Sequence, residues 1–166
     1  MSLYGTRQLV DSMRAVRQNT ILMAGDIPEE QYAFRATPET RSVAETLIHI
    51  AWLWTADHLI HEERRLDSFD GFDFPALLAT SAAEERVARS KAEITDRLRV
   101  EGERAAGWVE GLSDAFLSER ISFPDSGSVS RFEMLLGTKE HELQHRAQLT
   151  VMQRMMGIAP RFTGLA

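Results

Sequence analysis

A serine followed three residues later by a glutamate occurs at three places where a helix-like apolar pattern begins, and this signal constrains the fold most. The pairs are Ser42 with Glu45, Ser81 with Glu84, and Ser130 with Glu133. In such a capping box the serine oxygen accepts a hydrogen bond from the backbone amide of the glutamate, whose side chain reaches back to the serine amide. Three helices are therefore predicted to begin at these serines.

A further helix is predicted near the start of the chain, because Leu9, Met13 and Val16 recur at the spacing of one helical face. The last helix has a defined end, since Gly157 can adopt the left-handed conformation and Pro160 cannot prolong a helix. The expected helices cover about 4–24, 43–66, 82–110 and 131–156.

Proline and glycine occur between these segments and predict connections over 26–41, 67–80 and 112–129, with at most a short extended piece at Ile121–Phe123. No internal repeat and no sustained alternation of polar and apolar residues argues for a sheet. At 166 residues the chain has the size of one ordinary domain. We therefore expect a single all-α domain over residues 1–166, arranged as an up-and-down four-helix bundle.

The composition of the chain excludes several classes of protein. A net charge of −6 at pH 7 argues against a nucleic-acid partner, because proteins that bind nucleic acid usually carry basic surfaces. No apolar run is long enough to span a membrane, and the charged residues near the start do not fit a signal peptide, so a cytoplasmic location is expected. Since cysteine is absent, any metal site must use histidine and carboxylate ligands.

Three histidines carry the chemistry that the sequence predicts. His141 and His145 lie four residues apart, so their rings are about 40° apart around the predicted helix and one turn along it. On the predicted last helix they lie on the same face as apolar residues such as Met152. On the predicted second helix His49 lies on the same face as Leu53. All three imidazoles are therefore expected to point into the bundle.

A single inward histidine is usually a hydrogen-bonded core residue, but three such rings need partners for their nitrogens. One shared divalent transition-metal ion satisfies a nitrogen of each ring, which makes His49, His141 and His145 the candidate metal ligands. Three weaker candidates for the surroundings of the ion are Gln148, Glu45 and Trp52. The remaining histidines, His58 and His61, are expected at the surface because they lie away from the arc of His49.

The segment His141-Glu142-x-x-His145 also matches the zinc-protease signature, in which the glutamate is the general base. We do not favour this interpretation, because no third ligand follows and the helical wheel places Glu142 on the solvated side. No glycine-rich phosphate loop, serine nucleophile elbow or dinucleotide fingerprint is present. The sequence therefore assigns no catalytic residue.

A histidine in the middle of the second helix, followed by His-x-x-x-His-Arg-x-Gln and by Arg154, Gly157 and Pro160, resembles the DinB/YfiT-like superfamily over essentially the whole chain. This resemblance implies a four-helix bundle with up-down-down-up connections, often a homodimer, in which His49, His141 and His145 bind zinc, nickel or a similar ion. Ala147 replaces a glycine of the commoner motif, at a position outside the metal-facing arc. Large apolar residues expected outside the ligand faces, such as Leu47 and Trp54, also favour a dimer.

The resemblance extends to function, since relatives include transferases and isomerases that depend on low-molecular-weight thiols such as bacillithiol and mycothiol. It implies a transferase in which a metal-bound thiolate attacks a small electrophilic substrate. Two alternatives remain open: a metal-dependent hydrolase, and a non-catalytic binding module with a structural or regulatory metal. Either enzyme would take a small-molecule substrate, and the transferase would also need a thiol cofactor.

Overall fold

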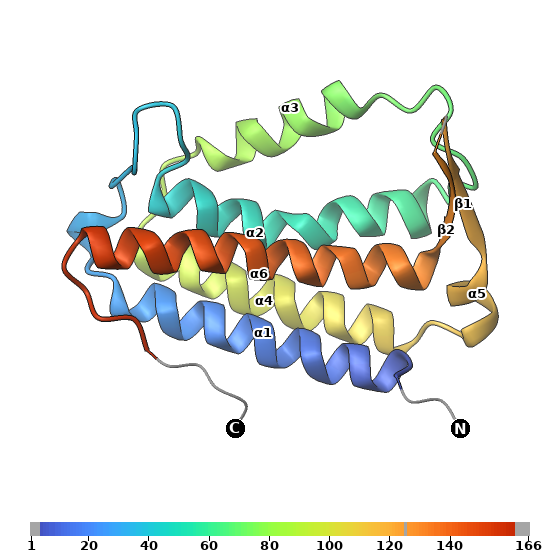
Figure 1. Ribbon diagram of the computed structural model, residues 1–166, viewed down its shortest axis with the longest axis horizontal. Helices are drawn as coiled ribbons and strands as arrows, with labels where there is room; N and C mark the ends of the chain where they lie inside the picture. Colours follow the sequence, from blue (N-terminus) through green and yellow to red (C-terminus); the bar gives the residue numbers. More distant parts are fainter. Residues whose placement is uncertain (1–3, 125, 162–166) are drawn as a thin grey trace.

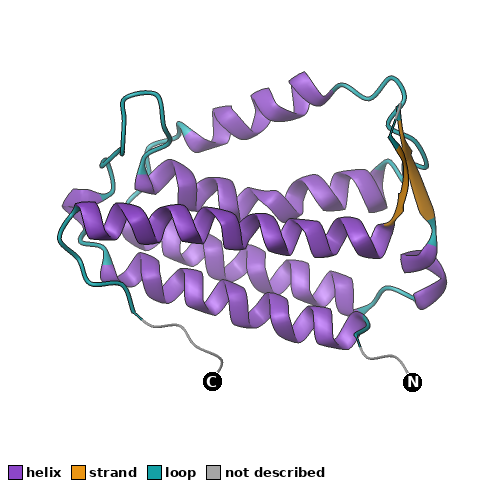
Figure 2. Cartoon of the chain, viewed as in Figure 1, coloured by secondary structure: helices purple, strands orange, loops and turns teal. Residues whose placement is uncertain are grey.

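The computed structural model describes residues 4–124 and 126–161, so both ends of the predicted 1–166 domain lie outside the described residues. Long helices packed side by side form the body of the molecule (Figures 1 and 2). They are α1 (Thr6–Asp26), α2 (Val43–His58), α4 (Lys91–Glu110) and α6 (Arg131–Met155). In Figure 1, α1 and α6 run from right to left, whereas α2 and α4 run from left to right. The predicted four-helix bundle is confirmed.

Two of the predicted capping boxes start helices as expected. At the start of α2 the hydroxyl oxygen of Ser42 accepts a hydrogen bond from the backbone amide of Glu45, and the backbone amide of Ser42 donates to the Glu45 carboxylate. Ser130 and Glu133 form the same reciprocal pair at the start of α6. These hydrogen bonds satisfy amides that have no partner within the helix.

The third predicted start was wrong. Ser81 lies inside the helix α3 (Phe74–Glu85), and α4 is capped instead by Ser90, whose capping box with Glu93 is complete. Part of the predicted connection 67–80 is therefore helical. The reason is that Pro75 occupies the first turn of α3, where the missing amide hydrogen of proline carries no penalty.

The other connections also contain local structure. The predicted 43–66 helix ends as α-helix at His58 and continues as a π-helical turn over Leu59–Glu63, labelled η2, while a short 3₁₀ turn, η1, covers Glu29–Gln31. Between α4 and α6 lie the short helix α5 (Asp114–Ser118) and a hairpin of β1 (Arg120–Phe123) and β2 (Gly127–Ser130). The hairpin confirms the extended piece expected at Ile121–Phe123.

The core lies between the long helices, and it includes residues that were expected to face outward. Leu47 and Trp54 are both buried inside the bundle. They therefore give no support to a dimer, contrary to the expectation from the sequence. The mistake arises because each long helix of a bundle packs against two neighbours, so a single apolar arc does not account for all of its buried surface.

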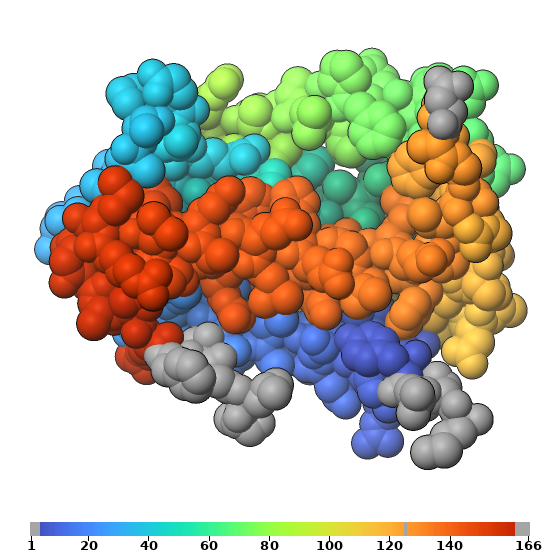
Figure 3. Space-filling model, in the orientation of Figure 1, coloured from blue at the N-terminus to red at the C-terminus, as the bar shows by residue number. Residues whose placement is uncertain are grey.

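The end of α6 follows the prediction. Gly157 has a φ of 77°, and its amide and that of Ile158 donate to the carbonyls of Arg154 and Gln153. This pair of bonds satisfies the last carbonyls of the helix. Figure 3 shows α6 in orange and red across the front of the molecule, above α1 in blue. Within 4–124 and 126–161, no helix has the length and apolar character that a membrane crossing needs.

Candidate metal centre

The imidazoles of His49, His141 and His145 converge between α2 and α6. Each offers a ligating nitrogen, and these three atoms all lie within 4.8 Å of one another. The ring centroids of His49 and His145 are 4.6 Å apart, as are those of His141 and His145. The structure thus brings together the three residues that the helical spacing singles out.

The pair on α6 presents two nitrogens to the same point. Because the residues are one turn apart, their rings stack with an interplanar angle of 29°, and their Nε2 atoms are 2.8 Å apart. A tetrahedral zinc ion with Zn–N distances of about 2.0–2.1 Å places its nitrogens roughly 3.3 Å apart. The donor set of three neutral imidazoles therefore fits a divalent transition metal after small side-chain movements.

His49 is oriented by a carboxylate that sequence reasoning missed. Its Nδ1 lies 2.8 Å from Oε1 of Glu85 and 3.3 Å from the Ser81 hydroxyl, both on α3. Since the carboxylate accepts, Nδ1 carries the proton and the lone pair of Nε2 is left for the ion. The available signal was the spacing of Ser81 and Glu85, which places them on one face of a helix, but that segment was not predicted as a single helix.

Glu85 is itself held in its ionised form. The Nε of Arg41 donates to its Oε2 at 2.7 Å, and the Ser81 hydroxyl donates to its Oε1 at 3.0 Å. Burial raises the pKa of this carboxyl, but the hydrogen bonds from Arg41 and His49 outweigh burial and leave the pKa below its usual value. A charged acceptor is therefore maintained next to His49.

The weaker candidates from the sequence have different outcomes. The Oε1 of Gln148 accepts from Nδ1 of His145 at 2.9 Å, so this ring also directs the lone pair of Nε2 toward the shared point. Glu45 instead pairs with Arg35 and caps α2, and it makes no hydrogen bond to the three rings. Trp52 is buried, but it is not one of the residues that line the cavity beside the cluster.

The three imidazoles are held in the neutral form that binds metal. Burial lowers the pKa of His49 to about 4, with a further contribution from the positive charge of Arg41. Burial also lowers the pKa of His141 and of His145 below the ordinary value for histidine. At neutral pH no proton therefore has to leave these rings before they bind an ion.

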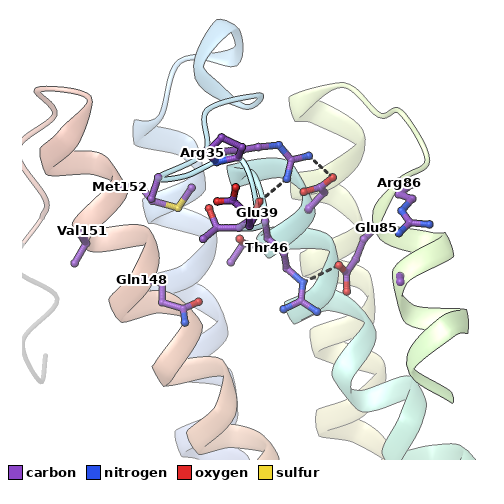
Figure 4. A pocket seen from close by; sticks show the side chains of 14 residues that line it. Arg35, Glu39, Thr46, Glu85, Arg86, Gln148, Val151 and Met152 are labelled. Atoms are coloured by element: carbon purple, nitrogen blue, oxygen red, sulfur yellow. Dashed lines mark hydrogen bonds and ion pairs between the residues drawn. The ribbon is translucent and has the colours of Figure 1, made fainter. Parts of the chain in front are cut away.

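A cavity of about 930 Å³ opens beside the cluster. Its walls come from the loop before α2, from α2 itself, and from α3 and α6 (Figure 4). Glu85 and Gln148, which hydrogen-bond to His49 and His145, both lie on these walls. The three histidines do not themselves line the cavity, so Glu85 and Gln148 connect a small molecule bound there to the candidate metal site.

Glu142 does not face solvent as the helical wheel predicted. It is 2% exposed and accepts two hydrogen bonds from Arg17, at 3.0 and 2.9 Å, and one from Thr20 at 2.8 Å. The prediction was wrong because this face of α6 packs against α1, where Arg17 supplies a buried countercharge. With both oxygens engaged, the carboxylate is not free to act as the base of a zinc protease.

His61 was also predicted to lie at the surface, and it is fully buried. Its Nδ1 accepts from Arg131 at 3.1 Å, and the π-helical turn that contains it changes the face expected from regular spacing. Asp57 lies next to it, with Oδ1 3.9 Å from Nε2 of His61, and burial raises the pKa of Asp57 to about 7. His58 is half-exposed and packs against Trp108.

Comparison with known proteins identifies one family and two similar structures. The model of the DinB superfamily matches residues 12–149, whereas no curated protein matches the chain. A DinB-like protein of Bacillus subtilis, YjoA, has a similar structure, with a TM-score of 0.68, 20% identity, and coverage of 96% of this chain and 99% of that one. For YfiT of Bacillus subtilis the TM-score is 0.71, the identity 15%, and the coverage 96% and 91%. YfiT is described as a "probable metal-dependent hydrolase with an unusual four-helix bundle topology".

Proposed function

This chain belongs to the DinB superfamily, and we propose that it is a metal-dependent enzyme whose divalent transition-metal ion, zinc or nickel, is bound by His49, His141 and His145. The observation that carries this proposal is the approach of three ligating nitrogens to within 4.8 Å of one another beside a cavity. The helix directions visible in Figure 1 support the up-down-down-up connection that the resemblance implies.

Three neutral ligands leave the bound ion its full positive charge, which lowers the pKa of a thiol or water molecule that reaches it. The protein supplies the orientation. Glu85 and Gln148 fix the rings of His49 and His145, and Arg41 adds a second positive charge at the cavity wall. The packed core behind the rings also limits access of water from that side.

We propose that the reaction is the transfer of a low-molecular-weight thiol to a small electrophile. The thiol loses its proton to the solvent, its sulfur forms a bond to the electrophilic carbon, and the bond from that carbon to the leaving group breaks, so that the leaving group departs with the electron pair. Because the chain contains no cysteine, the nucleophilic sulfur must come from a small molecule. The cavity of about 930 Å³ is large enough for such a molecule together with its acceptor.

The test is conjugation of a panel of thiols to a chlorinated dinitroaromatic acceptor by zinc-loaded and nickel-loaded protein. We expect at least one thiol to react faster than in buffer, and the acceleration to be lost in His141→Ala. His58→Ala is the matched control, because this half-exposed histidine lies outside the cluster. No histidine-dependent acceleration with any thiol would refute the transferase proposal.

Hydrolysis is the second candidate, favoured by the similarity to YfiT and by its description. The same three histidines would serve, with water in place of the thiol. Release of nitrophenol from activated esters by the same preparations separates the two reactions. If loaded protein holds its ion and catalyses neither reaction, the ion is structural or regulatory and the chain is a binding module.

We also propose that the chain forms a homodimer, as the resemblance to the superfamily implies. Sedimentation at micromolar concentration tests this directly, since a monomer would contradict it. The buried positions of Leu47 and Trp54 mean that any dimer interface must use other residues.

A further inference from the structure

The cavity beside the histidine cluster has three arginines on its walls, and they are not equally paired. Arg35 donates to the carboxylate of Glu45 and to the carbonyl of Thr40. Among the residues that the structure describes, Arg41 donates only its Nε, to Glu85, and its side chain is 42% exposed. The side chain of Arg86 is exposed and makes no hydrogen bond or ion pair within residues 4–124 and 126–161. Two guanidinium groups therefore retain free donors at the cavity wall.

Glu85 neutralises the charge of Arg41, but the acidic residues of the cavity do not occupy the terminal nitrogens of Arg41 or the side chain of Arg86. Glu45 accepts from Arg35 and from the amide of Ser42, and both oxygens of Glu85 are engaged by neighbouring side chains. Glu39 also lines the cavity, but Figure 4 shows it with the loop residues near Arg35, whereas Arg86 directly follows Glu85 at the end of α3. The α3 side of the cavity therefore has an excess of positive charge.

The position of Arg41 links this charge to the candidate metal site. Its guanidinium bonds to the carboxylate that orients His49. A group bound by the terminal nitrogens of Arg41 would therefore be separated from the ring of His49 by one residue, Glu85. Apolar side chains of Ala82, Val151 and Met152 provide an adjacent surface for the body of an organic molecule.

We propose that this cavity binds a small organic anion, whose carboxylate or phosphate is held by Arg86 and by the terminal nitrogens of Arg41. A guanidinium matches either oxyanion, because its planar donors can form two parallel hydrogen bonds. This inference rests on the proposed function only in taking the bound anion to be the substrate of the metal site. It makes Arg86 a residue that selects charged over neutral substrates.

Calorimetric titration with benzoate, phenyl phosphate and benzamide tests the proposal on metal-free and zinc-loaded full-length protein. We expect at least one of the two anions to bind more tightly than the neutral amide, and the tighter anion identifies the preferred oxyanion. In Arg86→Gln its affinity should fall about tenfold or more, since a hydrogen bond to a charged group has at least that effect. Arg86→Lys should recover part of the lost affinity, because lysine keeps the positive charge but lacks the two parallel donors of the guanidinium.

Arg99→Gln is the matched control, because Arg99 is an exposed arginine on α4 that pairs with Asp96 and does not line the cavity. It should bind the anions as the unaltered protein does. Anion binding that depends on Arg86 in protein that takes up no zinc would remove the proposed function and leave this inference standing. Zinc uptake without a preference for anions, or with full anion affinity in Arg86→Gln, would overturn this inference alone.

Discussion

Removing the carboxylate that orients His49 should weaken metal binding although Glu85 does not itself contact the ion. Glu85 accepts from Nδ1 of His49 at 2.8 Å and is fixed by Arg41 and Ser81. In Glu85→Ala the ring loses this acceptor, can adopt the other tautomer, and can rotate away from the rings on α6. In Glu85→Gln the amide oxygen can still accept, but the negative charge is lost.

The expected fall in zinc affinity depends on which hydrogen bonds each variant keeps. Partners of ligand histidines typically contribute about 10–100-fold to metal affinity, or roughly 1.4–2.7 kcal/mol. Glu85→Gln keeps a neutral acceptor and should lie near tenfold. Glu85→Ala removes the acceptor and also leaves Arg41 without its partner beside a divalent cation, so it should approach a hundredfold.

Zinc affinity is measured by competition with a chromophoric chelator at pH 7.5. Glu84→Gln is the matched control, because its side chain pairs with Arg89 and Arg97 and makes no contact with the histidines. This variant should bind zinc within about twofold of the unaltered protein. Unchanged zinc affinity in Glu85→Ala would refute the claim that α3 orients a ligand of the site.

Three further predictions concern stability. Because burial raises the pKa of Asp57 to about 7, the stability that this residue contributes is full below about pH 4 and is lost as the pH rises through 7. The free energy of unfolding of Asp57→Asn, measured in urea, should therefore rise relative to that of the unaltered protein by up to about 4 kcal/mol between pH 4 and 8. A difference that stays constant with pH would contradict this. Glu142→Ala should destabilise the fold by about 3–5 kcal/mol, since Arg17 stays buried without its partner. The zinc affinity of the folded molecules should change by no more than a few fold, and a large loss of zinc affinity would show that Glu142 has a role at the metal. Gly102→Ala should lower the melting temperature despite the higher helix propensity of alanine, because its Cβ would lie 2.6 Å from Cγ of Arg17; a stabilised variant would count against this packing.

The predictions that succeeded depend on local chemistry. The spacing of His141 and His145 fixes their common direction within one helix, and the boxes at Ser42 and Ser130 mark helix starts through hydrogen bonds between residues three apart. Ser81 matches the same pattern, yet its hydroxyl turns to Glu85 inside α3. A serine and a glutamate three residues apart therefore do not distinguish a helix start from a helix interior.

The wrong predictions for Glu142 and His61 have a different cause, which is that these polar residues were assumed to face solvent. Glu142 and His61 are buried because Arg17 and Arg131, distant in sequence, supply partners that a helical wheel cannot reveal. Glu85 was missed because its segment was not predicted as a single helix and because its hydrogen bond with His49 depends on how α3 packs against α2. Side chains on a single helix could be predicted, whereas pairs that join two helices required the packed structure.

The central claim, that three imidazoles hold one divalent ion, is tested most directly by elemental analysis and X-ray absorption of protein loaded with zinc or nickel and freed of unbound metal. We predict one ion per chain, with three histidine nitrogens at about 2.0–2.1 Å for zinc. The ion should be lost when His49, His141 and His145 are replaced together by alanine. A metal content near zero, or full retention of the ion in that triple variant, would contradict the account.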